Sequence, residues 1–306
     1  MVAASIMTVV LAAGVAVPAF AGTDPQPHIV GGHQPSQPYP AMASLQINHN
    51  GDPNFHICGA VLVSRRWLVT NAHCVTAPGN PTAEPAGMFH LRLGSPDRTA
   101  GGVLATVDKV VVHANWNWAN SPGPVADIAM LELSSFVQLQ PFEVAAVLHH
   151  TATMRVLGWG MTEPAPQPPL PTDLQELDTR LLPPDRCLDG GITAGEICLA
   201  NPHGTDGPCF GDSGGPALQR IAGTSRWADA GGASRETSEV GCGIAPTIYT
   251  DLTFYRPWMY QVMLTGTAPP RTSDAPSAND SGDLAVARAR FAQWTQYLTP
   301  PVQSGV

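Results

Sequence analysis

Residues 211–216 read Gly-Asp-Ser-Gly-Gly-Pro, a stretch in which three glycines surround one serine and one aspartate. Glycine has no Cβ, so a segment this rich in glycine can turn sharply and bring its backbone close to another molecule. Such a turn can expose the hydroxyl of Ser213 and aim the N–H groups of Gly211 and Ser213 at one point, where they would hold an oxyanion. A glycine-rich β-turn with an incidental serine is the simpler interpretation, and the upstream sequence decides between the two.

A serine hydroxyl is a weak nucleophile unless a neighbouring base takes its proton, and a carboxylate must orient that base. His73 lies near the end of the apolar stretch 68–74, and Asp127 opens the alternating apolar stretch 127–133. The order His, Asp, Ser is one of the orders in which unrelated folds assemble a catalytic triad. We therefore expect His73, Asp127 and Ser213 to be catalytic. The remaining histidines lack this context, and we expect them on the surface or in the core.

Four motifs together resemble those of a secreted trypsin-like (chymotrypsin-family) serine protease of the bacterial type, with a signal peptide and a short propeptide. In chain order they are Ile29-Val30-Gly31-Gly32, Thr70-Asn71-Ala72-His73-Cys74, Asp127-Ile128-Ala129-Met130-Leu131 and Gly211-Asp212-Ser213-Gly214-Gly215-Pro216. The resemblance covers about residues 29–264. It implies an all-β fold of two antiparallel six-stranded β-barrels, with a C-terminal helix and a flexible tail.

For function, the resemblance implies a secreted, extracellular serine endopeptidase that hydrolyses peptide bonds through an acyl-enzyme intermediate. Gly211 and Ser213 would form the oxyanion hole. A catalytically silent homologue that acts as a binding protein is the alternative, although such proteins usually lose a triad residue and this chain keeps all three. A narrow esterase or acyl-transfer role at the same site is a further alternative.

Short alternating apolar runs between Gly, Pro and Asn clusters support a β-rich fold, because a period of two is typical of half-buried strands. Such runs are Ala43–Ile47, Ala60–Val63, Leu91–Leu93, Val107–Val112, Ile128–Leu133 and Leu174–Leu182. Residues 255–264 resemble the C-terminal helix of the family.

The chain divides into four predicted segments. Residues 1–21 are a predicted signal peptide, with an apolar run and an Ala-x-Ala cleavage site, although no basic residue precedes the run. Residues 22–28 are a predicted propeptide, and residues 29–264 the protease domain. Residues 265–306 are a Pro/Ser-rich linker and an amphipathic tail. A tail helix docked on its own domain, a partner-binding or surface-anchoring helix, and a disordered tail all remain open.

Activation by cleavage before Ile29 is implied by the same resemblance. The freed ammonium of Ile29 would turn inward and pair with Asp212, and a buried charge needs such a partner. The chain is therefore an expected zymogen. His28 stands where the family has Arg or Lys, which argues against a tryptic activator and leaves the activating protease open.

Six cysteines in an exported chain predict three disulfides, but their spacing alone leaves the pairing open. The resemblance selects the pairs Cys58–Cys74, Cys187–Cys198 and Cys209–Cys242. A zinc site is the alternative, and the absence of any Cys-x-x-Cys pair argues against it.

The substrate pocket is placed by the resemblance at Gly207, Pro208, Ser234, Glu236 and Thr247. Gly207 stands where trypsin-type members have an Asp, and Asp206 is one position too early to replace it, because neighbouring side chains of extended backbone point to opposite sides. Thr247 would shorten the pocket. We expect small or medium apolar residues at P1, the substrate residue before the cleaved bond. A basic preference through Asp206 or Glu236 is the competing hypothesis.

Composition limits the partners. A net charge of −9 argues against nucleic acid, and no stretch beyond the signal is long and apolar enough to cross a membrane. We expect a monomer that acts on proteins or peptides, with a proteinaceous inhibitor and an activating protease as further candidate partners. We expect no cofactor and no metal, including no Ca²⁺ at residues 94–98, which lack paired acidic residues. Trp116 and Trp118, before Asp127, either wall a substrate subsite or pack in the core.

Overall fold

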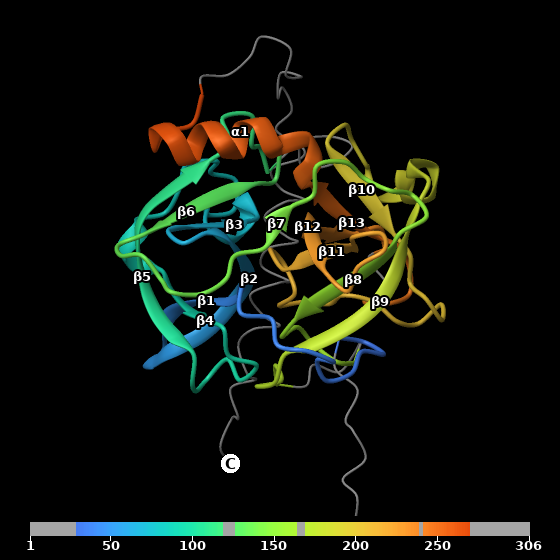
Figure 1. Ribbon diagram of the computed structural model, residues 1–306, viewed down its shortest axis with the longest axis horizontal. Helices are drawn as coiled ribbons and strands as arrows, with labels where there is room; N and C mark the ends of the chain where they lie inside the picture. Colours follow the sequence, from blue (N-terminus) through green and yellow to red (C-terminus); the bar gives the residue numbers. More distant parts are fainter. Residues whose placement is uncertain (1–28, 119–125, 164–168, 239–240, 270–306) are drawn as a thin grey trace, which may run out of the picture.

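The computed structural model describes residues 29–118, 126–163, 169–238 and 241–269, so the predicted signal peptide, propeptide and most of the tail lie outside the described residues. Two β-barrels lie side by side, and one helix runs across one end of the molecule (Figure 1). The expectation of two closed six-stranded antiparallel barrels with a C-terminal helix is confirmed.

The first barrel closes in the strand order β1-β2-β3-β6-β5-β4, and every neighbouring pair is antiparallel. Alternate side chains of these strands fill its interior, as the period-two runs predict, and Leu62 and Leu131 are fully buried there. Its strands are β1 (Met42–His49), β2 (Asp52–Ser64), β3 (Trp67–Thr70), β4 (His90–Leu93), β5 (Val103–Val112) and β6 (Ala129–Leu133).

The second barrel runs β11-β8-β9-β10-β13-β12, and pairing of β11 with β12 closes it. The short strand β7 (Glu143–Val144) adds to β12 in parallel. Ile29 lies in the apolar core of this barrel and is fully buried. The other strands are β8 (Thr153–Gly158), β9 (Gln175–Leu182), β10 (Glu196–Leu199), β11 (Pro216–Arg220), β12 (Trp227–Glu236) and β13 (Thr247–Asp251).

Helix α1 (Leu252–Thr265) directly follows β13 and begins three residues before the predicted helix. The Asp251 carboxylate caps it by accepting hydrogen bonds from the backbone N–H groups of Thr253 (2.8 Å) and Phe254 (3.2 Å). Its buried face packs against the first barrel. Three 3₁₀ turns are η1 (Ala72–Cys74), η2 (Ala86–Met88) and η3 (Pro184–Gly190).

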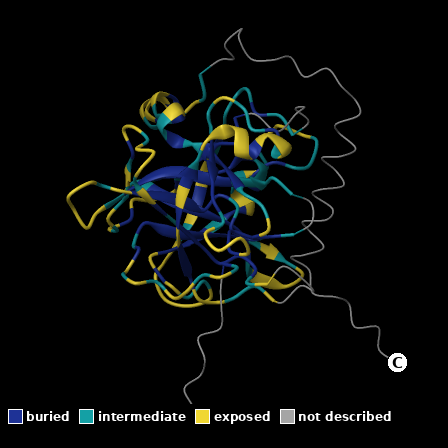
Figure 2. Ribbon diagram, turned by 90° about the vertical axis from the view of Figure 1, so that its right-hand side faces the viewer, coloured by how far each residue is buried: buried dark blue, intermediate teal, exposed yellow. Residues whose placement is uncertain are grey.

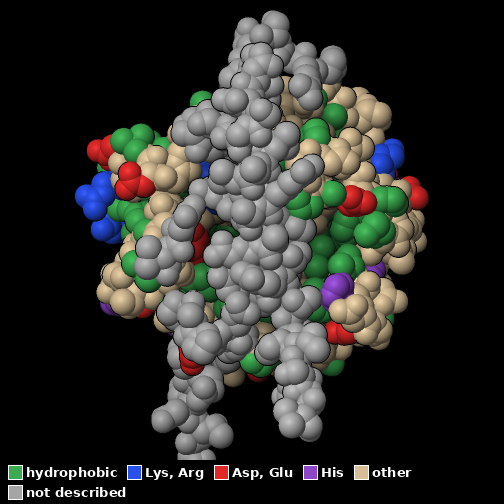
Figure 3. Space-filling model, turned by 180° about the vertical axis from the view of Figure 1, so that it is seen from behind, with side chains coloured by type: hydrophobic (Ala, Val, Ile, Leu, Met, Phe, Trp, Pro, Cys, Tyr) green, Lys and Arg blue, Asp and Glu red, His purple; other side chains and the backbone are tan. Residues whose placement is uncertain are grey.

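Buried residues concentrate in the strands, whereas most exposed residues lie in the connecting loops (Figure 2). A smaller apolar cluster, which includes Met42 of β1, Leu157 of β8 and Leu218 of β11, joins the two barrels. No helix in the described part of the chain is long and apolar enough to span a bilayer. On the visible parts of the face in Figure 3, basic side chains lie near acidic ones rather than forming one extended patch.

Candidate active site

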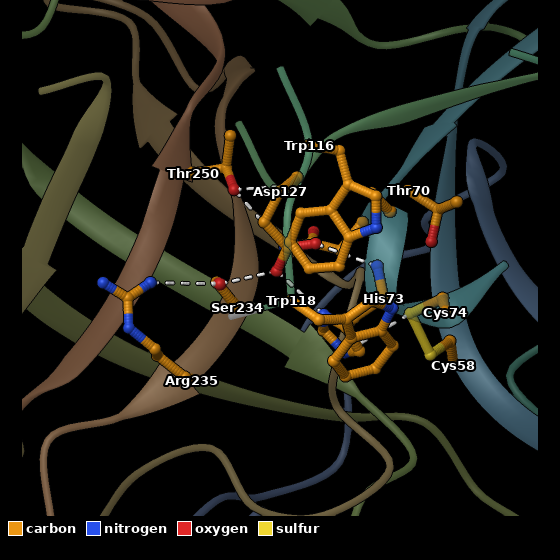
Figure 4. A network of polar contacts seen from close by, with 12 residues as sticks. Cys58, Thr70, His73, Cys74, Trp116, Trp118, Asp127, Ser234, Arg235 and Thr250 are labelled. Carbon is orange, nitrogen blue, oxygen red and sulfur yellow. Dashed lines mark hydrogen bonds and ion pairs between the residues drawn. A yellow bond between two sulfur atoms is a disulfide. The ribbon is translucent and has the colours of Figure 1, made fainter. Parts of the chain in front are cut away.

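His73 and Asp127 are brought together by two neighbouring strands of the first barrel. His73 lies in η1, just after β3, and Asp127 lies just before β6, whose Ala129 pairs with Thr70. His73 Nδ1 is 2.8 Å from Asp127 Oδ2, and the His73 backbone N–H donates to Oδ1 at 2.9 Å. These two contacts fix both the position and the ring orientation of His73 (Figure 4).

Two further side chains donate to the buried carboxylate of Asp127. Asn71 Nδ2 lies 2.9 Å and Ser234 Oγ 2.6 Å from Oδ2. Burial alone would raise the pKa of Asp127, but the adjacent His73 and the hydrogen bonds from His73, Asn71 and Ser234 hold it at about 2. Asp127 is therefore ionised at neutral pH. Sequence reasoning placed Ser234 in the pocket wall; the structure shows that its hydroxyl faces Asp127.

The Ser213 loop lies against the first barrel at the end of β3. The Ser213 carbonyl accepts from the backbone N–H of Gly59 at 2.7 Å, and the Gly59 carbonyl accepts from Thr70 Oγ1 at 2.8 Å. Gly214 has φ +74°, and a Cβ built on it would overlap Thr70 Oγ1 and the Gly59 carbonyl. Only glycine therefore fits at this position, and its close packing places Ser213 beside the end of β3.

The backbone of this loop leaves two donors available. Gly211 has φ +99°, in the region that favours glycine. Within the described residues, no backbone hydrogen bond from the N–H of Gly211 or Ser213 to another residue is present. Ser213 is half-buried. Its hydroxyl is not among the hydrogen-bond partners of His73 in the described chain; the nearby Cys74 Sγ lies 3.7 Å from His73 Nε2. Catalytic hydrogen bonds often tighten only when substrate binds.

His56 is a site residue that sequence reasoning missed, because it lies within the apolar run of β2 and has no motif of its own. It is 1% exposed. Its Nε2 lies 2.9 Å from the Gly211 carbonyl, and its Nδ1 lies 2.7 Å from Ser44 Oγ. Burial, with a smaller effect of Arg98, lowers the pKa of His56 to about 3. This histidine is therefore neutral and helps to fix the Gly211 peptide.

Asp212 is buried beneath the loop. Its Oδ1 accepts from the Gly160 N–H and its Oδ2 from the Cys209 N–H, both at 2.8 Å. Burial raises the pKa of Asp212 to about 7 despite these two hydrogen bonds. The predicted partner, Ile29, has its side chain in the second core and a φ of +45°, which is strained for a β-branched residue. The ion pair requires a free ammonium at Ile29 and stays a prediction.

The predicted pocket residues come from three separated segments. The Gly207 N–H donates to the Val30 carbonyl at 2.9 Å, and a Cβ built on Gly207 would lie 3.4 Å from Gly243 Cα. Pro208 is buried. Thr247 is 6% exposed and pairs in register with Glu236 at the end of β12.

Asp206 faces away from this region. Its carboxylate pairs with His203 and accepts from Thr205 Oγ1 at 3.2 Å. It also packs over Gly31, where any Cβ would overlap it. This orientation agrees with the expectation that extended backbone points Asp206 elsewhere.

Trp116 and Trp118 both donate to Thr76 Oγ1, at 3.1 and 2.9 Å. Trp116 is 2% exposed and packs in the core of the first barrel. Trp118 is half-buried, and its ring centroid lies 6.2 Å from that of His73 (Figure 4). The two tryptophans therefore have different surroundings: Trp116 is a core residue, and Trp118 lies beside the proposed base.

The described chain contains the three disulfides that the resemblance implies, Cys58–Cys74, Cys187–Cys198 and Cys209–Cys242. Cys58–Cys74 ties β2 to the His73 turn, and Cys209–Cys242 borders the Ser213 loop. Two groups of metal-ligand types occur among the described residues, and each contains one of these disulfides. Metal ligation needs a thiolate rather than a disulfide sulfur, so neither group fits a metal.

The family model described as Trypsin matches residues 29–259. Transmembrane protease serine 11G of rat is 32% identical over 241 residues, which are 73% of this chain and 52% of the relative. The chain thus spans about half the length of that relative. Chymotrypsin-like elastase family member 1 of cat is 30% identical over 249 residues, 77% of this chain and 89% of the relative.

Human kallikrein-14 is 31% identical over 251 residues, which are 77% of this chain and 84% of the relative. Among solved structures, neuropsin, a serine protease of mouse brain, superimposes with a TM-score of 0.63 and 26% identity. That match covers 77% of this chain and 100% of the neuropsin chain. The relatives named here are animal proteins, so the expected bacterial type stays a prediction.

Proposed function

The chain belongs to the trypsin family of serine proteases, and on that premise we propose that it is an active, secreted serine endopeptidase. It is made as a zymogen, becomes active when the chain is cut before Ile29, and hydrolyses peptide bonds through an acyl-enzyme. Its partners are protein or peptide substrates, an activating protease and a proteinaceous inhibitor.

One observation carries the proposal: a buried, ionised Asp127 holds Nδ1 of His73 at 2.8 Å. The carboxylate accepts the Nδ1 proton, so the neutral ring keeps its lone pair on Nε2. A base with this tautomer can accept the proton of a serine hydroxyl. The Ser213 loop packs beside it through Gly214 and leaves two backbone N–H groups unused.

In the proposed reaction, Ser213 Oγ attacks the carbonyl carbon of the cleaved bond while His73 Nε2 takes the hydroxyl proton. The N–H groups of Gly211 and Ser213 stabilise the negative oxygen of the tetrahedral intermediate. His73 then gives its proton to the leaving amine, and the acyl group stays on Ser213. Water repeats the sequence: His73 takes one of its protons, the hydroxide oxygen attacks the ester, and the acid product leaves as Ser213 regains its proton.

Activation acts on the same loop. A free Ile29 ammonium would neutralise Asp212, whose carboxylate has two backbone hydrogen bonds but no positive partner among the described residues. Because Asp212 adjoins Ser213, its charge state and position affect the oxyanion donors. We therefore propose that cleavage before Ile29 completes the oxyanion hole.

The test is mass spectrometry of secreted protein treated with a fluorophosphonate, with Ser213→Ala as the matched control. The intact mass locates the mature N-terminus, and the adduct reports whether Ser213 is activated. We expect a chain that starts at Ile29 and is labelled only in the wild type.

Two other results have defined meanings. An Ile29-started chain that refuses the reagent would refute an active protease and favour a silent binding homologue. An unlabelled chain that still carries residues 22–28 would identify a zymogen, and labelling should then appear once the bond before Ile29 is cut. Turnover of peptide against ester substrates distinguishes a protease from a narrow esterase.

A further inference from the structure

Glu236 places a carboxylate in the region that the family resemblance assigns to substrate. It is the last residue of β12, two positions after Ser234. One of its carboxylate oxygens lies within 4.8 Å of the sulfur atoms of both Cys209 and Cys242. Cys209 belongs to the chain segment that continues directly into the Ser213 loop, so this carboxylate lies between that segment and the residues after β12.

Nearby acidic side chains are already satisfied, whereas Glu236 is not. Glu196 forms a buried ion pair of 2.5 Å with Arg235, and Asp206 pairs with His203. The oxygens of Asp212 accept from two backbone N–H groups. Within the described chain, the carboxylate of Glu236 has no hydrogen bond and no ion pair, although the residue is half-buried. Its neighbour Arg235 is engaged with Glu196 and cannot serve as its counter-ion.

Among the described residues, those at the base of the predicted pocket carry no charge. Gly207 has no side chain, and Gly243 lies directly behind it. Thr247, the register partner of Glu236, presents a buried neutral side chain. Among the described residues of this region, a substrate side chain would therefore meet one carboxylate, that of Glu236, on the wall beside the disulfide rather than at the base.

We propose that Glu236 determines the substrate class, and that the enzyme prefers a positively charged residue, Lys or Arg, at P1. This rests on the proposed function, because the pocket has a role only if Ser213 acts on peptides. The P1 ammonium or guanidinium pairs with the Glu236 carboxylate beside Cys209–Cys242. The proposal replaces the sequence-based expectation of small apolar P1 residues.

The electrostatics of the empty site agree with this role. Burial, and then the negative charge of Asp212, raise the pKa of Glu236 to about 8. The other ionisable group that faces it, Tyr249 of β13, has its own pKa raised well above the usual value by burial and stays neutral. Glu236 is therefore mostly protonated at pH 7, and pairing with a cation would expel that proton.

The test compares kcat/KM for peptide substrates that differ only at P1, where lysine is set against norleucine, its uncharged analogue. The variants are Glu236→Gln, Asp206→Asn and the control Glu143→Gln, which makes the same chemical change at an exposed glutamate beside Arg226. We expect wild type and Glu143→Gln to prefer lysine by roughly 10- to 100-fold, the range of a charged hydrogen bond. Glu236→Gln should lose this preference through a fall of roughly 10- to 100-fold in kcat/KM for the lysine substrate.

A second measurement needs no turnover. Calorimetry of benzamidine binding in buffers of different ionisation enthalpy, at pH 7, should show proton release in wild type and none in Glu236→Gln. Benzamide, the neutral counterpart, should show no such release in either protein. These readouts separate a lost charge from a misfolded site.

Contrary results are equally specific. Norleucine preferred over lysine in wild type, or a lysine preference lost in Asp206→Asn but kept in Glu236→Gln, would overturn the assignment. Fluorophosphonate labelling of Ser213 distinguishes the two proposals, because the reagent carries no charged P1 group. Labelling without a lysine preference refutes only the role of Glu236, and absence of labelling in an Ile29-started chain refutes both.

Discussion

Replacing Asp127 by Asn preserves the shape of the side chain and removes one acceptor from a crowded site. Oδ1 accepts from the His73 backbone N–H at 2.9 Å. Oδ2 accepts from three groups: His73 Nδ1, Asn71 Nδ2 and Ser234 Oγ. An amide has only one oxygen, so its NH₂ group must face one of these two sets of donors.

The two orientations have unequal costs. With the NH₂ group at the Oδ1 position, it opposes a peptide N–H that cannot reverse, which costs about 1–3 kcal/mol for an unsatisfied buried donor. At the Oδ2 position the three partners can adapt: the Ser234 hydroxyl rotates, the Asn71 amide turns over so that its oxygen accepts, and His73 accepts at Nδ1 by moving its proton to Nε2. The second orientation is therefore favoured. In it, Nε2 of His73 is protonated and lacks the lone pair that the proposed mechanism uses to accept the Ser213 proton.

We therefore expect kcat/KM of Asp127→Asn to fall by about 10⁴-fold, or about 5 kcal/mol of transition-state stabilisation. The free energy of unfolding should fall by only about 1–2 kcal/mol, because the fold keeps most of the hydrogen bonds. The assay is kcat/KM on a peptide anilide, alongside urea unfolding. Ser234→Ala is the control, since it removes one donor but leaves the tautomer intact, and its loss of activity should stay below about tenfold. Activity of Asp127→Asn within about tenfold of wild type would refute the tautomer argument.

Three further predictions concern stability. Glu196→Gln leaves the buried guanidinium of Arg235 without its counter-ion and should lower the free energy of unfolding by about 3–5 kcal/mol, whereas exposed Glu143→Gln should change it by less than about 1 kcal/mol in the same urea titration. Gly214→Ala adds a Cβ that overlaps Thr70 Oγ1 and the Gly59 carbonyl at a positive φ; it should lower Tm by several degrees and abolish fluorophosphonate labelling, and an unchanged Tm would contradict the packing. Burial raises the pKa of Asp212 to about 7, so the folded uncleaved chain binds more protons than the unfolded chain from about pH 4 upward, and its stability should fall as pH rises to about 7. Thermal scans across this range should show a smaller fall in stability for Asp212→Asn. A stability that rises with pH in the wild type but not in Asp212→Asn would contradict this prediction.

The strands, the helix and the contact between His73 and Asp127 were predictable because each has a local signal. The alternating run at residues 128–133 and the apolar stretch before His73 form neighbouring strands, and this adjacency brings Asp127 to the imidazole. The disulfide pairing came from the resemblance and not from the spacing. Local pattern and family motif together were sufficient for the framework of the site.

What the sequence left undetermined depends on contacts between distant segments. His56 looks like an ordinary strand residue until β2 meets the Gly211 peptide. Arg235 carries no signal of its partner Glu196, which lies on another strand. Asp206 packs over Gly31, whereas Glu236 lies beside the Cys209–Cys242 disulfide. Neither neighbour could be read from the local sequence. These features arise from tertiary packing, which residue-level patterns do not report.

The hydrogen bond from the Gly59 N–H to the Ser213 carbonyl crosses from the first barrel to the second. The backbone of Ser213 is thus held to the barrel that carries His73, although its own chain segment leads into β11 of the other barrel. Any shear between the two barrels must break this contact before it can separate Ser213 from His73. In the proposed active enzyme, heat or denaturant that separates the two barrels should therefore abolish turnover.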